Sequence, residues 1–346
     1  MSVLVESASL PLSILIGVVG LVVLVVSADR AVDRLVGLAN YFNLSTTFVG
    51  MTVVSLATSI PEISAHLTAS FGILDKTLDY KVGSSIVLGA NIGSDVVQQT
   101  LIMGIVVFLA GSLFFERSFL TKNMLPMIGT TLMCIILGFD GFYSRVDGAI
   151  LFGSFIAYSY YLYRDDRRNT AASETVALQD DEAEEAEGPQ TAREAATYAF
   201  SALLFMTLTI FAAEIVLNVT EKMVSYTGIG GSLIGVLTLG IASALPELTT
   251  AISGVRNKEQ GISLGTLIGS NITNPLVAIG GGALVSTYFV PRPLITWDLP
   301  WETLTGLMLW VILWFRKGKI GKWGALYFVG IYFVYLYFRA TVFAVD

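Results

Sequence analysis

Two stretches of the sequence decide the fold: Gly50-Met-Thr-Val-Val-Ser-Leu-Ala-Thr-Ser-Ile-Pro-Glu62 and Gly235-Val-Leu-Thr-Leu-Gly-Ile-Ala-Ser-Ala-Leu-Pro-Glu247. Both are apolar apart from a few hydroxyl groups, and both end in Pro-Glu. When the two are aligned, the matching residues are Gly50 and Gly235, Ala57 and Ala242, Pro61 and Pro246, and Glu62 and Glu247. The chain therefore contains an internal repeat.

The likeness continues on both sides of these stretches. Upstream, Ala28-Asp29 pairs with Ala213-Glu214 at the same separation. Downstream, Gly89-Ala-Asn-Ile-Gly-Ser-Asp95 pairs with Gly265-Thr-Leu-Ile-Gly-Ser-Asn271, and the first copy is longer in the segment 71–83. The repeat thus extends well beyond one short motif.

The composition is that of a membrane protein. The 346 residues are 54% hydrophobic and only 14% charged, whereas a soluble domain is about 25% charged. Long apolar runs such as Ser13–Val26 and Met124–Phe139 recur along the chain. These features exclude a disordered protein, a disulfide scaffold and a nucleic-acid binder. The single Cys134 and single His66 also argue against an internal disulfide and a multi-histidine metal centre.

Apolar runs of about 20 residues without alternation predict membrane-spanning helices. We expect an all-α integral membrane protein with ten of them, near 10–28, 44–70, 82–112, 122–139, 147–163, 196–218, 230–254, 262–288, 302–315 and 323–340. Residues 1–163 then form a first five-helix repeat and residues 195–346 a second. Because five is an odd number, the two repeats must lie inverted relative to each other in the bilayer.

The segment 164–194 between the repeats is polar and ends in an acidic run, which predicts a solvated linker. With ten helices both termini lie on one side. If that side is outside, most of the 20 Lys and Arg residues fall in cytoplasmic segments. We therefore predict a multi-pass protein of the cell membrane with its termini outside and the acidic linker in the cytoplasm.

Glu62 and Glu247 are the candidate functional residues, because a carboxylate at the bilayer centre costs about 2.5–3.5 kcal/mol and is rarely only structural. Each follows a proline that frees a carbonyl oxygen four residues earlier in the helix. Hydroxyl groups stand beside them, on Thr58, Ser59 and Ser243. Carboxylate, carbonyl and hydroxyl oxygens favour a hard cation such as Ca²⁺ or Na⁺ over zinc or copper.

A second pair of polar positions follows each Pro-Glu motif. Ser94 and Gln98 are four residues apart and share one helix face, as do Ser270 and Asn274. They are candidate ligands, although polar side chains also serve to hold membrane helices together.

On these residues the chain resembles the sodium/calcium exchanger branch of the cation/calcium antiporters, whose two inverted motifs read G-T-S-[LIV]-P-[ED] and G-S-N-x-x-[ND]. The resemblance covers nearly the whole chain. It implies that Glu62 and Glu247 are central ion ligands. Beside them it places Ser94, Gln98, Ser270 and Asn274, and it assigns Thr58 and Ser243 to flanking sodium sites. It also implies that the first and sixth helices slide as a pair.

The chain departs from the family in three respects. Gln98 and Asn274 leave only two carboxylates at the four core positions, and Ala244 replaces a serine. Asp95 replaces the usual Asn and adds a carboxylate next to Ser94, which makes it a candidate accessory ligand. On a helix it points about 100° away from Ser94, so a packing role is the alternative.

We therefore predict a secondary-active antiporter that exchanges Na⁺ for Ca²⁺ by alternating access, with these ions as cargo and no resident cofactor. A proton-coupled antiporter, or one for Mg²⁺ or K⁺, is the alternative. An enzyme is not expected, because no catalytic constellation accompanies the glutamates. A passive channel is disfavoured, because channels usually build their pore from several subunits. The sequence indicates no oligomeric state.

Overall fold

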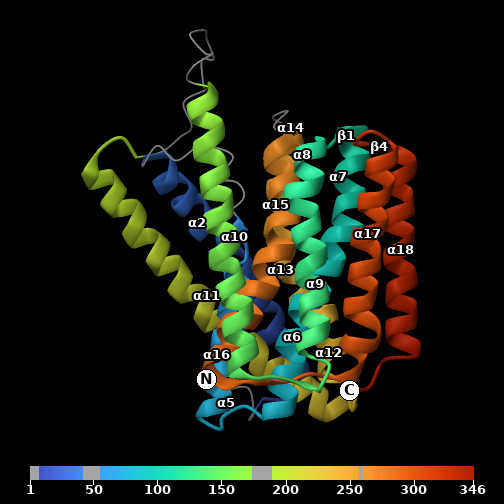
Figure 1. Cartoon of the computed structure of the whole chain (residues 1–346). Helices are drawn as coiled ribbons and strands as arrows, with labels where there is room; N and C mark the ends of the chain where they lie inside the picture. Colours follow the sequence, from blue (N-terminus) through green and yellow to red (C-terminus); the bar gives the residue numbers. More distant parts are fainter. Residues whose placement is uncertain (1–7, 42–54, 174–188, 257–259) are drawn as a thin grey trace.

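Helices that stand side by side make up most of the chain (Figure 1), and the computed structural model describes residues 8–41, 55–173, 189–256 and 260–346. Of the residues that the structure describes, 85% are helical. This agrees with the absence of period-two alternation in its apolar runs. The whole predicted acidic run, residues 180–187, lies outside the described residues, as do residues 44–54 of the second predicted span.

The first half of the chain contains a broken series of helices. These are α2 (Leu10–Tyr41), α4 (Ser55–Thr58), α5 (Ile60–Leu74), α6 (Tyr80–Val97), α7 (Met103–Ala110), α8 (Arg117–Phe119), α9 (Leu125–Leu137) and α10 (Arg145–Ser173). The π-helical segment η2 (Gln98–Ile102) joins α6 to α7, and η3 (Leu120–Met124) joins α8 to α9.

A second broken series of helices follows in the second half. Its helices are α11 (Ala192–Thr227), α12 (Gly231–Gly235), α13 (Ile241–Ser243), α14 (Leu245–Arg256), α15 (Gln260–Thr273), α16 (Gly280–Ser286), α17 (Leu299–Phe315) and α18 (Lys322–Thr341). Three π-helical segments join or extend them: η4 (Val236–Gly240), η5 (Asn274–Ile279) and η6 (Leu294–Asp298). Segments η2 and η5 begin at Gln98 and Asn274, the matching positions of the two repeats. Widened turns of this kind often mark functional sites.

Five helical stretches of the described chain are long and apolar enough to cross a membrane. They are Leu10–Leu35, Tyr80–Ala110, Arg117–Leu137, Ala192–Thr227 and Gly231–Arg256. The count of ten spans stays a prediction. Several predicted boundaries were wrong. The first, fifth and sixth helices were expected to end near residues 28, 163 and 218, but α2, α10 and α11 end at Tyr41, Ser173 and Thr227. The ninth span was expected to begin at residue 302, but its helical residues begin at Leu294.

Large apolar side chains cover the outside of the bundle. On α11, for example, Phe200 and Leu203 are mostly exposed, and on α2 so are Val18 and Val22. Exposed apolar surface of this extent is costly in water and suits lipid.

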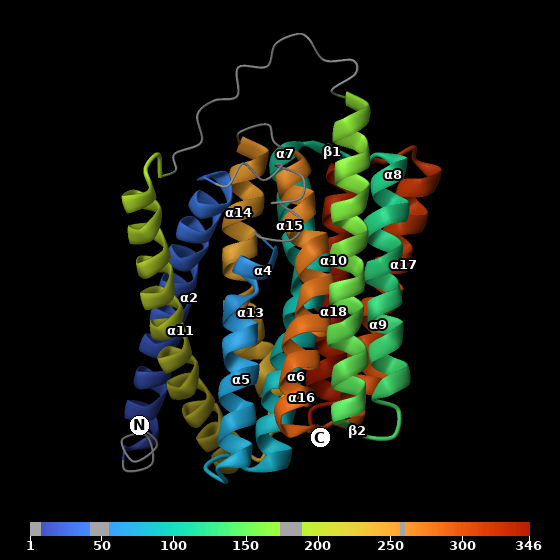
Figure 2. The same ribbon diagram turned by 60° about the vertical axis from the view of Figure 1, so that its left-hand side comes forward.

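Two short antiparallel strand pairs tie the halves together. Strand β1 (Ser112–Phe114) pairs with β4 (Lys319–Gly321), and β2 (Phe142–Tyr143) pairs with β3 (Tyr288–Phe289). The β1–β4 pair lies at the opposite end of the bundle from β2 (Figure 2). Each pair therefore joins a loop of one half to a loop of the other.

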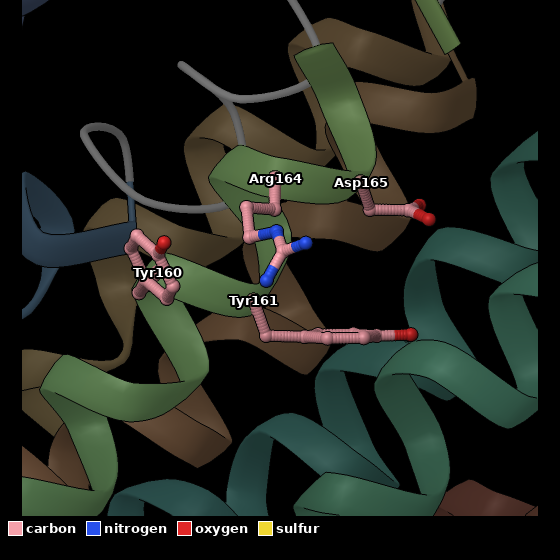
Figure 3. Close-up of a pocket in the computed structure, with 4 residues that line it drawn as sticks. All are labelled: Tyr160, Tyr161, Arg164 and Asp165. Atoms are coloured by element: carbon pink, nitrogen blue, oxygen red, sulfur yellow. The ribbon is translucent and has the colours of Figure 1, made fainter. Parts of the chain in front are cut away.

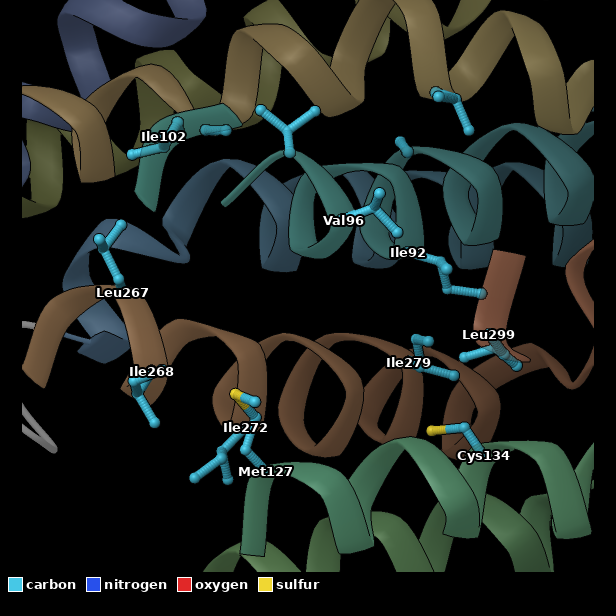
Figure 4. Packing of buried hydrophobic residues seen from close by; sticks show 14 of the residues in the cluster. Ile92, Val96, Ile102, Met127, Cys134, Leu267, Ile268, Ile272, Ile279 and Leu299 are labelled. Carbon is cyan, nitrogen blue, oxygen red and sulfur yellow. The ribbon is translucent and has the colours of Figure 1, made fainter. Parts of the chain in front are cut away.

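The core lies around α6, whose residues from Gly83 to Val97 are all buried. Ile92 and Val96 of α6 belong to the same apolar cluster as Ile272 of α15 and Cys134 of α9 (Figure 4). The buried Cys134 is thus a packing residue. The centre of the membrane bundle is therefore built from segments of both halves.

Candidate functional site

The glutamates stand at two interrupted helices. Helix α4 ends at Thr58 and α5 begins at Ile60, so Ser59 alone separates them; Ala244 separates α13 from α14 in the same way. Each proline lies at the start of the new helix, where its missing N–H removes no bond.

This interruption places both carboxylates in the first turn of a helix, Glu62 in α5 and Glu247 in α14. The positive end of the helix dipole stabilises a carboxylate there. The first helical turn also has free backbone N–H groups that carry partial positive charge. Local sequence thus explains how two acidic side chains are tolerated at these buried points.

Both glutamates are buried, Glu62 with 3% and Glu247 with 0% of its surface exposed. Their charges are close enough to interact. The hydroxyl of Ser243 lies near Glu62 and that of Thr58 near Glu247, so each carboxylate has a hydroxyl neighbour from the other half. The two motifs, far apart in sequence, thus meet in one place.

The partner helices bring in the second set of predicted residues. The Ser94 hydroxyl donates to Glu62 Oε1 at 3.0 Å, and Gln98 Nε2 donates to Ser94 Oγ at 3.0 Å. The Ser270 hydroxyl donates to Gln98 Oε1. Asn274 Nδ2 donates to Asp95 Oδ1 at 2.8 Å. The helix face predicted from the spacing of Ser94 and Gln98 is confirmed.

Several buried oxygens of this cluster have no hydrogen-bond partner among the described residues. They are Ser59 Oγ, Glu62 Oε2, both carboxylate oxygens of Glu247, Asp95 Oδ2 and Asn274 Oδ1. Buried polar atoms are almost always paired, so a group of unpaired acceptor oxygens needs an explanation. A hard cation, which binds through oxygens alone, is the partner that this donor set fits.

The carboxylates do not form such a site by themselves. No three His, Cys, Asp or Glu side chains in the described ranges are arranged to hold a metal ion. Amide, hydroxyl or main-chain oxygens must therefore complete the coordination of any cation bound here. This requirement fits the mixed set of residues predicted from the sequence.

Three more buried polar residues belong to the cluster and were not predicted: Asn271, Gln99 and Glu302. Gln99 Nε2 donates to Asn271 Oδ1 at 2.9 Å and to Glu302 Oε1 at 3.4 Å. Asn271 aligns with Asp95 in the internal repeat, and this alignment was the sequence feature that could have identified it. Glu302 was missed because the ninth span was expected to start there, which would have put it at the membrane surface.

A pocket on the second half of α10 is separate from this cluster. Tyr160, Tyr161, Arg164 and Asp165 line it (Figure 3). Lys122 Nζ forms an ion pair with Asp165 Oδ2 at 2.6 Å. The pocket contains none of the residues predicted to bind ions, so it is not part of the candidate site.

Comparison with known proteins finds relatives that match over nearly the whole chain. The chain is 28% identical to the inner membrane protein YrbG of Escherichia coli (strain K12) over 328 residues, covering 92% of this chain and 94% of YrbG. It is 23% identical to the sodium/calcium exchanger MaX1 of Methanosarcina acetivorans, covering 93% and 97% of the two chains.

Solved structures of the sodium-calcium exchanger NCX_Mj share the fold. The structure soaked with 2.5 mM Na⁺ and 0.1 mM Ca²⁺ matches with a TM-score of 0.62 at 21% identity, covering 96% of this chain and 98% of the other. The family model described as Sodium/calcium exchanger protein matches residues 12–164 and 197–341, which include both glutamate motifs. The chain therefore belongs to the sodium/calcium exchanger protein family.

Proposed function

We propose that this antiporter exchanges Na⁺ for Ca²⁺ across the cell membrane by alternating access around Glu62 and Glu247. Membership of the family makes it a multi-pass membrane protein that transports cations by exchange. The observation that carries the specific proposal is the meeting of two buried carboxylates, one from each half, with unpaired oxygens.

The choice of ions follows from the donor set. Ca²⁺ takes six to eight oxygen ligands in flexible geometry, and Na⁺ also binds through oxygen. Glu62, Glu247 and Asn274 supply unpaired oxygens, and Thr58, Ser59, Ser94, Ser243 and Ser270 supply hydroxyls. The relative MaX1 is a sodium/calcium exchanger, which supports the same pair of ions here.

Charge neutralisation explains why transport is an exchange. Two carboxylates that interact in a buried site repel each other unless a cation or protons compensate them. An empty site is therefore poor at closing, whereas a site loaded with Ca²⁺ or Na⁺ can close and reopen on the other side. Because each transition needs a load, the entry of Na⁺ drives Ca²⁺ the other way.

We also propose that residues 1–163 and 195–346 are inverted repeats joined by the cytoplasmic linker 164–194. The matched helix breaks at Ser59 and Ala244 and the two strand pairs at opposite ends support this. Helix α2 begins and α18 ends at one end of the bundle, whereas α10 ends and α11 begins at the other (Figure 1). This placement supports termini and linker on opposite sides of the membrane, and the excess of Lys and Arg in the segments on the linker side supports a cytoplasmic linker.

Flux through purified protein in liposomes tests the proposal. Vesicles loaded with Na⁺ are diluted into Na⁺-free buffer that contains radioactive Ca²⁺, with an ionophore to clamp the potential. We expect Ca²⁺ uptake that disappears when Na⁺ is equal on both sides. Uptake that follows only a proton gradient, or a gradient of K⁺ or Mg²⁺, would assign the alternative antiporter. Absence of any coupled flux would overturn the proposal.

A further inference from the structure

The third residue of each Gly-Ser-X motif contacts a side-chain amide from the opposite half. Asp95, in the first half, accepts a hydrogen bond from Asn274 in the second, 2.8 Å from Oδ1 to Nδ2. Asn271, in the second half, donates to Gln98 in the first, 3.0 Å from Nδ2 to Oε1. All four side chains have 0% exposure. The two contacts are equivalent in position but opposite in chemistry, because Asp95 accepts where Asn271 donates.

The contact with Asp95 determines which atom of Asn274 is free. Asp95 Oδ1 is the acceptor of this contact, so it engages the NH₂ group of Asn274. The remaining atom, Asn274 Oδ1, is buried and has no partner among the described residues. Asn274 therefore has an oxygen available for a cation.

The contact with Asn271 has the opposite effect on Gln98. Gln98 Oε1 accepts from both Ser270 and Asn271, which fills the two lone pairs of a carbonyl oxygen. The NH₂ group of Gln98 donates to Ser94, which in turn donates to Glu62. Gln98 thus directs hydrogen-bond donors, and no free oxygen, towards the glutamate.

The orientation of Asn271 is set by the residues behind it. Gln99 Nε2 donates to Asn271 Oδ1 at 2.9 Å, which leaves the NH₂ group of Asn271 for Gln98. Glu302 Oε1 accepts from Gln99 Nε2 at 3.4 Å and from the Thr131 hydroxyl at 2.9 Å. The Thr305 hydroxyl donates to Gln99 Oε1 at 3.3 Å. Asn271 Nδ2 also donates to the main-chain oxygen of Leu267 at 2.6 Å, so Glu302, through Gln99, and the Leu267 carbonyl together orient Asn271.

We infer that Asp95 and Asn271 are specificity-determining positioning residues: Asp95 makes the oxygen of Asn274 available to the transported cation, and Asn271 withholds the oxygen of Gln98. This inference rests on the proposed site and refines its ligand set. The four core positions then provide two carboxylates and one amide oxygen, and the fourth position provides an NH₂ group. The site binds cations asymmetrically although its motifs are repeated.

The substitution Asn271→Asp tests the inference. The new carboxylate cannot donate to Gln98 Oε1, so the Gln98 amide should turn its NH₂ group to position 271 and its oxygen to Ser94. One further ligand oxygen should tighten Ca²⁺ binding by about tenfold, the effect of one charge-assisted contact. Calorimetric titration of CaCl₂ into the purified protein measures this change.

A second background separates this effect from the added negative charge. The charge alone strengthens Ca²⁺ binding whatever residue stands at position 98, so Asn271→Asp is also measured together with Gln98→Leu. We expect the combined variant to lose most of the gain relative to Gln98→Leu alone. An equal gain in both backgrounds, or no gain in either, would overturn the inference.

The variant Glu302→Gln tests the same inference at a residue that is not a proposed ligand and acts on Asn271 through Gln99. A glutamine can donate to Gln99, so the chain can reverse and release the oxygen of Gln98, with loss of the Asn271 bond to the Leu267 carbonyl. Loss of a nearby negative charge would by itself weaken Ca²⁺ binding, whereas we expect a gain that Gln98→Leu abolishes. If Asn271→Asp fails to fold, as judged by size-exclusion chromatography, this variant decides the question. The two proposals can fail separately. If Ca²⁺ binding changes in the way that depends on Gln98 but the protein shows no Na⁺-driven flux, the inference is supported and only the proposed function is refuted.

Discussion

Ser59 and Ala244 have the same backbone conformation at the same place in the two halves. Ser59 has φ −80° and ψ 5°, and Ala244 has φ −80° and ψ −5°. Both lie in the bridge region between helix and strand. Each interrupts a helix two residues before a proline, so the following glutamate enters the first turn of a new helix. The backbone, and not only the sequence, is therefore repeated at the site.

The first prediction concerns the two glutamates. Glu62→Gln and Glu247→Gln each keep the shape of the side chain but remove a charge that a bound cation needs. We expect either variant to lose most Na⁺-driven Ca²⁺ flux, by about 100-fold or more, since a buried charged contact is worth about 3 kcal/mol. Liposome flux measures the effect. Glu116→Gln, at an exposed position, is the matched control, and wild-type flux in either site variant would refute the central pair.

The second prediction concerns the close approach of α6 and α12. A Cβ added to Gly235 would lie 2.2 Å from the carbonyl oxygen of Ile86, and one added to Gly89 would lie 2.2 Å from that of Ser232. Backbone atoms cannot yield as a flexible side chain does, so Gly235→Ala should destabilise the protein by about 1–3 kcal/mol. Thermal unfolding in detergent measures this loss.

The control for this prediction is a glycine with open space around it. Nothing lies within 4 Å of a Cβ at Gly330 in α18. Gly330→Ala should therefore leave the unfolding temperature unchanged or raise it, because alanine favours a helix by up to about 1 kcal/mol over glycine. Equal losses at both positions would show that the α6–α12 contact is not the cause.

The third prediction concerns a buried ion pair. Arg339 Nε lies 2.9 Å from Asp298 Oδ2, and both side chains have 0% exposure. Removing one partner leaves a buried charge unpaired, so Arg339→Met should cost about 3–5 kcal/mol of stability. Combining it with Asp298→Leu should recover part of the loss, because two apolar groups replace the pair.

The partly exposed pair of Lys122 and Asp165 provides the comparison. Its side chains are 35% and 29% exposed, and pairs of this kind contribute about 0–1 kcal/mol. Lys122→Met should therefore lower the unfolding temperature much less than Arg339→Met. Similar shifts for the two variants would mean that burial does not govern the Arg339 pair.

The fourth prediction concerns the helices expected to slide. The hydroxyls of Ser27 in α2 and Thr209 in α11 lie 2.8 Å apart, and Figure 2 shows the two helices side by side. A disulfide between cysteines placed at these positions should leave flux intact, because the helices move as a pair. A disulfide between cysteines at Ala31 and Ala57, which share one apolar cluster, should block flux until it is reduced.

This prediction has its own internal check. Flux is measured before and after reduction, so each variant serves as its own reference. Block by the Ser27–Thr209 link, or free flux through the Ala31–Ala57 link, would contradict paired sliding of α2 and α11.

Much of the candidate site could be predicted because its residues are recognisable from their neighbours in the sequence. A carboxylate after a proline in an apolar run is conspicuous in the sequence, and Glu62 and Glu247 were found in this way. Ser94 and Gln98 followed from helical spacing alone. Glu302 escaped prediction because its significance depends on where a helix begins, and helix boundaries are the least reliable feature of a sequence.

The direction of the hydrogen bonds could not be predicted at all. The sequence shows an amide at position 98 and another at position 274, and both were expected to offer oxygens. Which atom is free depends on Asp95 and Asn271, which come from opposite halves of the chain. No local pattern encodes a contact between residues so far apart in sequence.

The sequence by itself determined the membrane setting, the repeat and the two acidic residues, since hydropathy, proline and buried charge act over a few neighbouring positions. Only the tertiary structure decided which oxygens are unpaired and which amide presents its NH₂ group. The reason is physical: hydrogen-bond saturation depends on every donor and acceptor within about 3 Å, and here those groups come from helices of both halves.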